Sequence, residues 1–168
     1  MGYNTIKIKK YTDIVEEYAA AAALYPGHLL EITAAGTVQK HSGAGKTAPA
    51  LFALEDELQG KGIGVSGAYA AGDRVQVWHA TPGEVVYARQ ADEEALLIGD
   101  FVESNGLGQV RKVVRTNESW ESADSQAAKS SYDRHIVGIV LTACDTTSLS
   151  TDESEVRTTE QYVVIKIV

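Results

Sequence analysis

The chain has 168 residues, of which 44% are hydrophobic, and a formal net charge of -8 at pH 7, so its length and composition predict one globular domain that buries a core. The acidic balance argues against a protein that binds DNA, RNA or anionic lipid, because phosphate groups are held by clustered Lys and Arg. A single cysteine excludes an intramolecular disulfide, and no stretch approaches the roughly 18 apolar residues of a membrane-spanning helix.

The first ten residues alternate between apolar and cationic side chains. Ile6 and Ile8 fall on one side and Lys7 and Lys9 on the other, which is the period-two pattern of a strand or an extended arm. Two interpretations stay open: the segment reaches onto another protein, or it forms an ordinary edge strand of the domain.

The next segment, residues 11–27, reads YTDIVEEYAAAAALYPG and predicts a short helix. Asp13 is placed as an N-cap with Glu16 three residues later, the intervening Glu and Ala residues favour helix, and Pro26-Gly27 ends it. We therefore expect an N-terminal arm and short helix over residues 1–25, followed by a β-rich domain over residues 26–168.

From residue 29 onward the chain is a series of short β-like runs separated by glycine-containing turns. The runs are LLEIT, TVQKH, RVQVWHA, EVVYARQ, ALLI, QVRKVV, IVGIVLTA and YVVIKIV. This spacing favours a mainly β fold, a small sandwich-like or barrel-like domain with short helical turns, over βαβ units, which need longer helices between strands.

Two phrases place Gly-Asp directly before a strand, AAGDRVQV at residues 70–77 and LIGDFVES at residues 97–104. We expect both strand entries to be built alike. Two polar, serine-containing stretches, residues 116–133 and 146–161, are interpreted as exposed loops, and whether they have a role is left open.

The stretch HSGAGKTA, residues 41–48, resembles the end of a nucleotide-binding P-loop. The motif requires a glycine where this chain has Lys40, and it requires a buried strand before the loop and a helix after it. Here the approach is polar and Pro49 follows closely. We therefore interpret the stretch as a flexible connection and Lys46 as a solvated surface lysine.

Catalytic and metal-binding patterns are not evident. The histidines (His28, His41, His79 and His135) are scattered singly, and the acidic residues in LEDE lack the spacing of a calcium loop. No nucleophile elbow is visible. The sequence predicts a protein without enzymatic activity, cofactor or metal.

One block of phrases carries a family resemblance: PGHLLE, ALEDELQGKGI, YAAGDRV, PGEVVYA and IGDFVESNG. In these phrases the chain closely resembles the head-decoration, or capsid cement, proteins of tailed bacteriophages. It departs from the expected phrases at KGIGVSGAYAAGD, which carries extra Gly and Ser, and in the polar loop at residues 116–133.

The resemblance implies a structural virion protein, not an enzyme. Such a protein would bind the outer surface of the mature phage head and stabilise contacts between major capsid subunits, and the expected partners are the major capsid protein and further copies of itself in a trimer. It would be made in the bacterial host cytoplasm. The candidate capsid-contacting residues in the arm are Tyr3, Ile6, Ile8 and Tyr11. The alternative is a tail or receptor-facing component of the virion.

Overall fold

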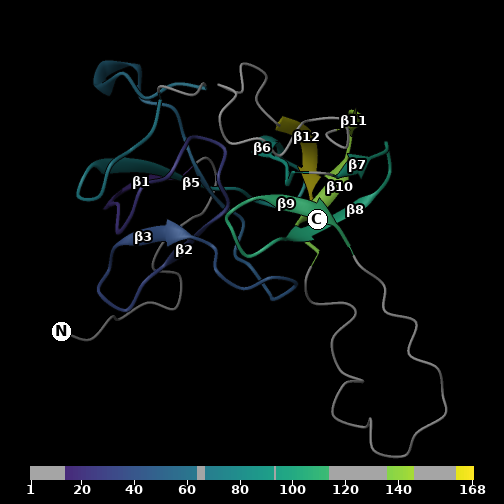
Figure 1. The fold of residues 1–168 in the computed structure, drawn as a ribbon, viewed down its shortest axis with the longest axis horizontal. Coiled ribbons are helices and arrows are strands. Elements are labelled where there is room, and N and C mark those ends of the chain that lie inside the picture. Colours follow the sequence, from purple (N-terminus) through teal and green to yellow (C-terminus); the bar gives the residue numbers. More distant parts are fainter. Residues whose placement is uncertain (1–13, 64–66, 93, 114–135, 146–161) are drawn as a thin grey trace, which may run out of the picture.

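The computed structural model describes residues 14–63, 67–92, 94–113, 136–145 and 162–168, which form a mainly β structure (Figure 1). The strands are β1 (Ile14–Ala19), β2 (Leu30–Ile32), β3 (Val38–Lys40), β4 (Leu51–Ala53), β5 (Arg74–His79), β6 (Val85–Arg89), β7 (Ala95–Leu96), β8 (Phe101–Ser104), β9 (Val110–Lys112), β10 (Gly138–Val140), β11 (Cys144–Asp145) and β12 (Tyr162–Ile167). Helical structure in this part of the chain is limited to the 3₁₀ turn η1 (Glu57–Gln59). The predicted fold class is confirmed.

The N-terminal strands form a first lobe. It contains a three-stranded antiparallel sheet in the order β1-β5-β4 and the β2-β3 hairpin. Between them lies the first core, whose buried members are Ala20, Leu24, Leu30, Val38, Leu51, Ala53, Tyr69, Val75 and Val77.

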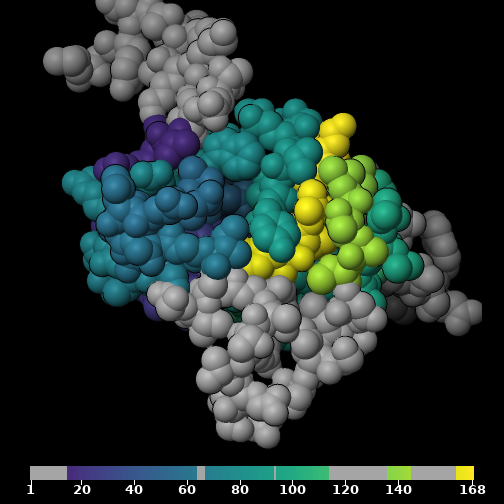
Figure 2. Space-filling model, turned by 90° about the horizontal axis from the view of Figure 1, so that it is seen from above, coloured from purple at the N-terminus to yellow at the C-terminus, as the bar shows by residue number. Residues whose placement is uncertain are grey.

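The C-terminal strands form a second lobe. A five-stranded sheet runs in the order β6-β12-β10-β8-β9, with β11 and β7 paired beside it. The second core comprises Leu29, Phe52, Val86, Ala88, Leu96, Val102, Val110, Val137, Val140, Val163, Ile165 and Ile167. Figure 2 shows the blue N-terminal segments and the green and yellow C-terminal strands on opposite sides of the molecule.

The two lobes share the short strand β4 as a common wall. Successive side chains of a strand point to opposite faces, so Leu51 and Ala53 enter the first core while Phe52 enters the second. The adjacent residues Leu29 and Leu30 divide in the same way. The lobes are therefore joined by the packing of these side chains as well as by the covalent backbone.

The helix predicted for residues 11–27 is wrong: β1 occupies Ile14–Ala19 and pairs in register with all six residues of β5. Helix propensity contributes only a few tenths of a kcal/mol of free energy per residue. It is outweighed here by pairing along the full length of β5, and exposure alternates from Val15 to Ala20 as in a strand.

Most of the other predicted strand positions are confirmed, with two differences. β4 was not among the predicted runs, since LFA is too short to show a period. The run at residues 136–143 is not one strand, because β10 ends at Val140 and the pairing resumes in β11 at Cys144.

The two Gly-Asp strand entries are built alike, as expected. Asp73 accepts a hydrogen bond from Ala70 N at 2.9 Å, and Asp100 accepts one from Leu97 N at 2.9 Å. In each turn the preceding glycine has a φ of 89°, a left-handed value that glycine adopts without steric cost. Each carboxylate also binds a lysine: Lys61 at 2.8 Å for Asp73 and Lys112 at 2.9 Å for Asp100. The same lysines lower the pKa of both carboxyl groups.

Candidate interaction surfaces

The arm residues predicted to contact a capsid, Tyr3, Ile6, Ile8 and Tyr11, lie outside the described residues. The structure does place the point where the arm joins the body. β1 begins at Ile14, which pairs with His79 at the end of β5. The arm therefore leaves the body beside that end of the first lobe's sheet.

The HSGAGKTA stretch forms a loop that packs on the β8–β9 hairpin. Gly45, with a φ of 60°, donates its N–H to the carbonyl of Ser104 at 2.9 Å. Gly106 approaches so closely that an added Cβ would lie 2.9 Å from Ala44 N. The loop leads into strand β4 and not into a helix, and the Lys46 side chain is exposed. These features agree with a connecting loop.

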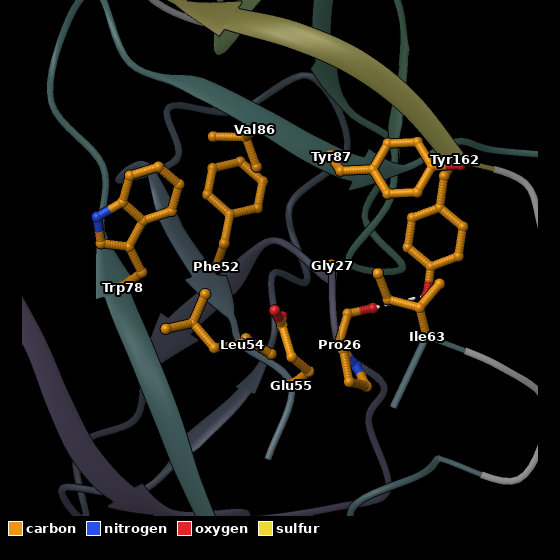
Figure 3. A pocket seen from close by; sticks show the side chains of 11 residues that line it. Pro26, Gly27, Phe52, Leu54, Glu55, Ile63, Trp78, Val86, Tyr87 and Tyr162 are labelled. Atoms are coloured by element: carbon orange, nitrogen blue, oxygen red, sulfur yellow. Dashed lines mark hydrogen bonds between the residues drawn. The ribbon is translucent and has the colours of Figure 1, made fainter. Parts of the chain in front are cut away.

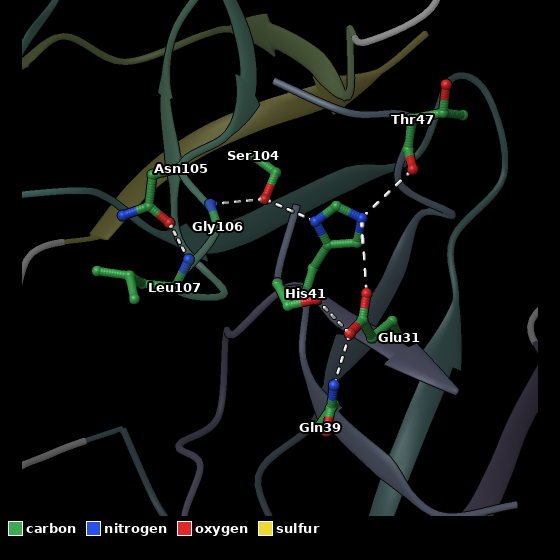
Figure 4. Close-up of polar contacts among 9 residues, drawn as sticks. Glu31, Gln39, His41, Thr47, Ser104, Asn105, Gly106 and Leu107 are labelled. Atoms are coloured by element: carbon green, nitrogen blue, oxygen red, sulfur yellow. Dashed lines mark hydrogen bonds and ion pairs between the residues drawn. The ribbon is translucent and has the colours of Figure 1, made fainter. Parts of the chain in front are cut away.

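A buried histidine fastens this loop and β3 to the second lobe (Figure 4). His41 Nδ1 lies 2.8 Å from Ser104 Oγ, and its Nε2 lies 3.3 Å from Thr47 O and 3.9 Å from Glu31 Oε2. Gln39 and Ser42 each donate a hydrogen bond to Glu31 Oε1, at 2.6 Å and 2.8 Å. Desolvation is the largest single effect on the pKa of Glu31 and raises it. The hydrogen bonds from Gln39 and Ser42 together outweigh desolvation, so the pKa of Glu31 lies below its ordinary value.

Ser104, His41 and Glu31 resemble a hydrolytic triad in composition only. The Ser104 side chain is fully buried, and its hydroxyl oxygen also accepts the N–H of Gly106 at 3.1 Å. A nucleophile must reach its substrate and be hydrogen-bonded to a base that is free to take its proton. Here the hydroxyl links hairpin, loop and strand, so the set holds the lobes in place.

A small apolar pocket lies between the lobes (Figure 3). Its volume is about 130 Å³. Phe52 lies at its centre, with Trp78 on one side and Tyr87 and Tyr162 on the other. Gly27 is required beside it, because an added Cβ would lie 2.6 Å from the ring of Tyr162. Sequence analysis missed this pocket, since its residues come from distant segments and only Pro26-Gly27 gave a local signal.

One side of the pocket is reinforced by stacked aromatic rings and an arginine. The Tyr87 and Tyr162 rings stack with centroids 4.7 Å apart, and the Arg89 guanidinium lies 5.2 Å from the Tyr162 ring and 4.8 Å from the Tyr25 ring. Tyr162 donates its hydroxyl hydrogen to Pro26 O at 3.0 Å. Such cation–π and stacking contacts hold the side chains of Tyr162 and Arg89 in place.

His28 is buried beneath this cluster and accepts the N–H of Tyr25 on Nδ1 at 3.0 Å. Burial, together with the positive charges of Arg89 and Lys40, lowers its pKa to about 3. The imidazole is thus neutral and structural. His28 and His41 are thus both buried and hold structural contacts, whereas His135 lies outside the described residues.

The outer edge of β6 is open next to the pocket. On this side the backbone N–H of Arg89 donates a hydrogen bond to Gly27 O at 3.0 Å. The backbone groups of successive residues in a strand point to opposite edges, so the N–H and C=O groups of Val85 and Tyr87 point to the same edge as those of Arg89. Within the described residues neither has a backbone partner there. Their side chains are 52% and 49% exposed.

Within the described residues there is no group of three His, Cys, Asp or Glu side chains placed to hold a metal ion. In the same part of the chain no helix is long and apolar enough to cross a membrane.

Comparison with known proteins gives a likeness at the level of the fold. No family model matches the chain, and no curated protein matches it. Among solved structures, the N base of the head fiber protein gp8.5 of bacteriophage phi29 is similar in fold, with a TM-score of 0.54 and 9% sequence identity. The match covers 94% of this chain and 95% of that one. At this identity the likeness concerns the fold.

Proposed function

We propose that the protein is a structural component of a bacteriophage head that binds the outer surface of the mature shell and stabilises contacts between major capsid subunits. The observation that carries the proposal is the fold, which is shared over nearly the whole chain with the base of a phage head fiber. The decoration-protein phrases of the sequence, such as ALEDELQGKGI, point the same way independently.

The described body shows what two of those phrases do in this chain. In ALEDELQGKGI, Asp56 caps η1 by accepting the N–H groups of Leu58 and Gln59, and Lys61 reaches Asp73 of the AAGD turn. These two phrases thus specify turns that fix the body. A body of this kind acts as a rigid platform for binding.

Stabilisation would arise by linkage. A ligand that binds only the expanded shell lowers the free energy of that shell relative to its disassembled state. Modest contacts become strong when one assembly holds several subunits at once, and for this reason we include a trimer in the proposal. Tyr3, Ile6, Ile8 and Tyr11 are our candidates for the shell contact, by strand addition to a capsid edge. No catalytic step is needed.

The test uses expanded heads that lack the protein. We expect purified protein to bind them at saturating, regular positions and to raise their temperature of disruption. Ile6→Asp with Ile8→Asp should weaken binding at least about tenfold, because two charges would be buried at the contact, whereas Ile32→Asp, at an exposed position of β2, should not. Heads that neither bind the protein nor gain stability would contradict the proposal.

A second candidate is a base that attaches a projecting fibre or a receptor-facing element to the virion. The likeness to a head fiber base favours it specifically. Electron microscopy of virions separates the candidates: density lying flat over the head supports decoration, projections from the head support a fibre base, and density on the tail contradicts both.

A further inference from the structure

We infer that the pocket and the open edge of β6 together form a docking groove for the chain's own N-terminal arm, residues 1–13, in the free protein. This inference concerns the unbound molecule and does not rest on the proposed function. It starts from two neighbouring features where the lobes meet, the apolar pocket and the outer edge of β6.

The groove offers both elements of strand addition. Within the described residues, the main-chain groups of Val85 and Tyr87 have no backbone partner on the outer edge of β6. They continue the line on which the backbone N–H of Arg89 bonds Gly27 O at 3.0 Å. Beside them lies the pocket of about 130 Å³. A cavity of roughly 150 Å³ accommodates benzene, so this pocket has room for one aliphatic side chain. In strand addition, main-chain bonds give affinity and such pockets give specificity.

The arm starts close to this groove. Val15, Trp78 and Phe52 are aligned across three adjacent strands, as Val15 pairs with Trp78 and Trp78 with Phe52. Trp78 and Phe52 line the pocket, and Val15 is 45% exposed at the end of their row. Neighbouring strands lie about 5 Å apart, so the arm emerges within roughly 10–15 Å of the pocket, whereas thirteen extended residues span roughly 40 Å.

The chemistry of the arm matches the groove. Ile6 and Ile8 alternate with Lys7 and Lys9, so a strand that places an isoleucine in the pocket directs its lysines outward. The body is acidic, with a net charge of -8 for the whole chain, and the exposed Glu55 lines the pocket. Because the arm is tethered beside the groove, its effective concentration there is high, which favours docking in the same molecule.

Docking would make the arm's two uses mutually exclusive. While residues 1–13 occupy the groove they cannot add a strand to another protein, and their release uncovers the edge of β6. The groove would therefore hold the arm until a partner that binds the arm more tightly is present.

The test reports on Trp78 in the full-length protein. Trp120→Phe leaves Trp78 as the single tryptophan of a chain that has two. In that background Ile6→Ser with Ile8→Ser should red-shift Trp78 emission, increase its quenching by acrylamide about twofold, and speed tryptic cleavage after Lys7 and Lys9 several-fold. Ile32→Ser, at a 45% exposed isoleucine of β2, is the matched control and should change none of these readouts.

Dilution distinguishes the occupant. An arm held by its own molecule gives quenching that is independent of concentration over a roughly hundredfold range, since the docking is unimolecular. Quenching that rises on dilution would overturn the inference in favour of a second copy. Unchanged Trp78 emission and cleavage in the double variant would overturn it altogether. Neither result depends on phage heads, so failure here is distinct from failure of the proposed function.

Discussion

Gly27 combines two demands that only glycine meets. Its φ is 81°, and an added Cβ would lie 2.6 Å from the Tyr162 ring and 3.1 Å from Tyr87 O. Gly36 has a similar φ of 75° but nothing within 4 Å of the same position. The pair separates the cost of backbone conformation from the cost of a steric clash.

We expect Gly36→Ala to lower the free energy of unfolding by about 1–2 kcal/mol, the cost of a left-handed alanine. Gly27→Ala should lower it clearly further, because the Tyr162 ring and the main chain of β6 must also move. Urea unfolding of both variants measures the difference. Equal losses would mean that the aromatic cluster yields freely to the methyl group.

His28 should make stability depend on pH. Its pKa is about 3 in the folded protein and 6.5 in a free side chain, so between these values the unfolded chain binds a proton that the folded protein excludes. This contribution to stability is therefore complete above pH 6.5 and is lost as the pH falls, with a slope approaching about 1.4 kcal/mol per pH unit.

His28→Asn tests this directly, because the asparagine oxygen can still accept the N–H of Tyr25 but cannot be protonated. Unfolding measured between about pH 7.5 and pH 5, above the range where most carboxyl groups titrate, should show a flatter dependence for the variant. The same slope in both proteins would show that His28 becomes protonated without unfolding.

At the scale of elements, the sequence predicted best where a local rule decides the structure. The Gly-Asp turns can be recognised from the sequence alone. The glycine supplies the left-handed residue, and the carboxylate of the following Asp accepts the backbone N–H of Ala70 in one turn and of Leu97 in the other. Runs such as RVQVWHA and YVVIKIV show their period within the run and became β5 and β12.

Elements defined by distant partners were not predictable in this way. β1 looks helical until it is aligned with β5, and β4 has only three residues, so its identity depends on Val77 to His79 across from it. The pocket and the β6 edge join residues from six separate segments. Their sequence positions carry no common pattern, and the geometry appears only when both lobes are assembled.

At the scale of the whole molecule, the shared wall predicts that the lobes unfold together. Phe52 is 1% exposed and belongs to the second core, while its neighbours Leu51 and Ala53 belong to the first. Phe52→Ala should lower the free energy of unfolding by about 3–5 kcal/mol through lost burial and the cavity left behind. It should do so for both lobes in a single transition.

The measurement compares urea unfolding followed by backbone circular dichroism with unfolding followed by Trp78 fluorescence in the Trp120→Phe background. Coincident curves for parent and variant are expected. Two separated transitions in Phe52→Ala would contradict a common wall. Leu58→Ala, at a fully exposed residue of η1, is the control and should leave both curves unchanged.

The three residues of β4 also constrain how such a chain can drift over evolutionary time. Deleting or inserting one residue at positions 51–53 would exchange the contents of the two cores, sending the aromatic ring to the side that holds a leucine and an alanine. Changes of length are harmless only in the connections. Proteins that diverge from this sequence should therefore differ in loop length on either side of β4 but keep an aromatic residue facing the second core and smaller apolar residues facing the first. The three residues of β4 would then serve as a reference point for aligning very distant relatives.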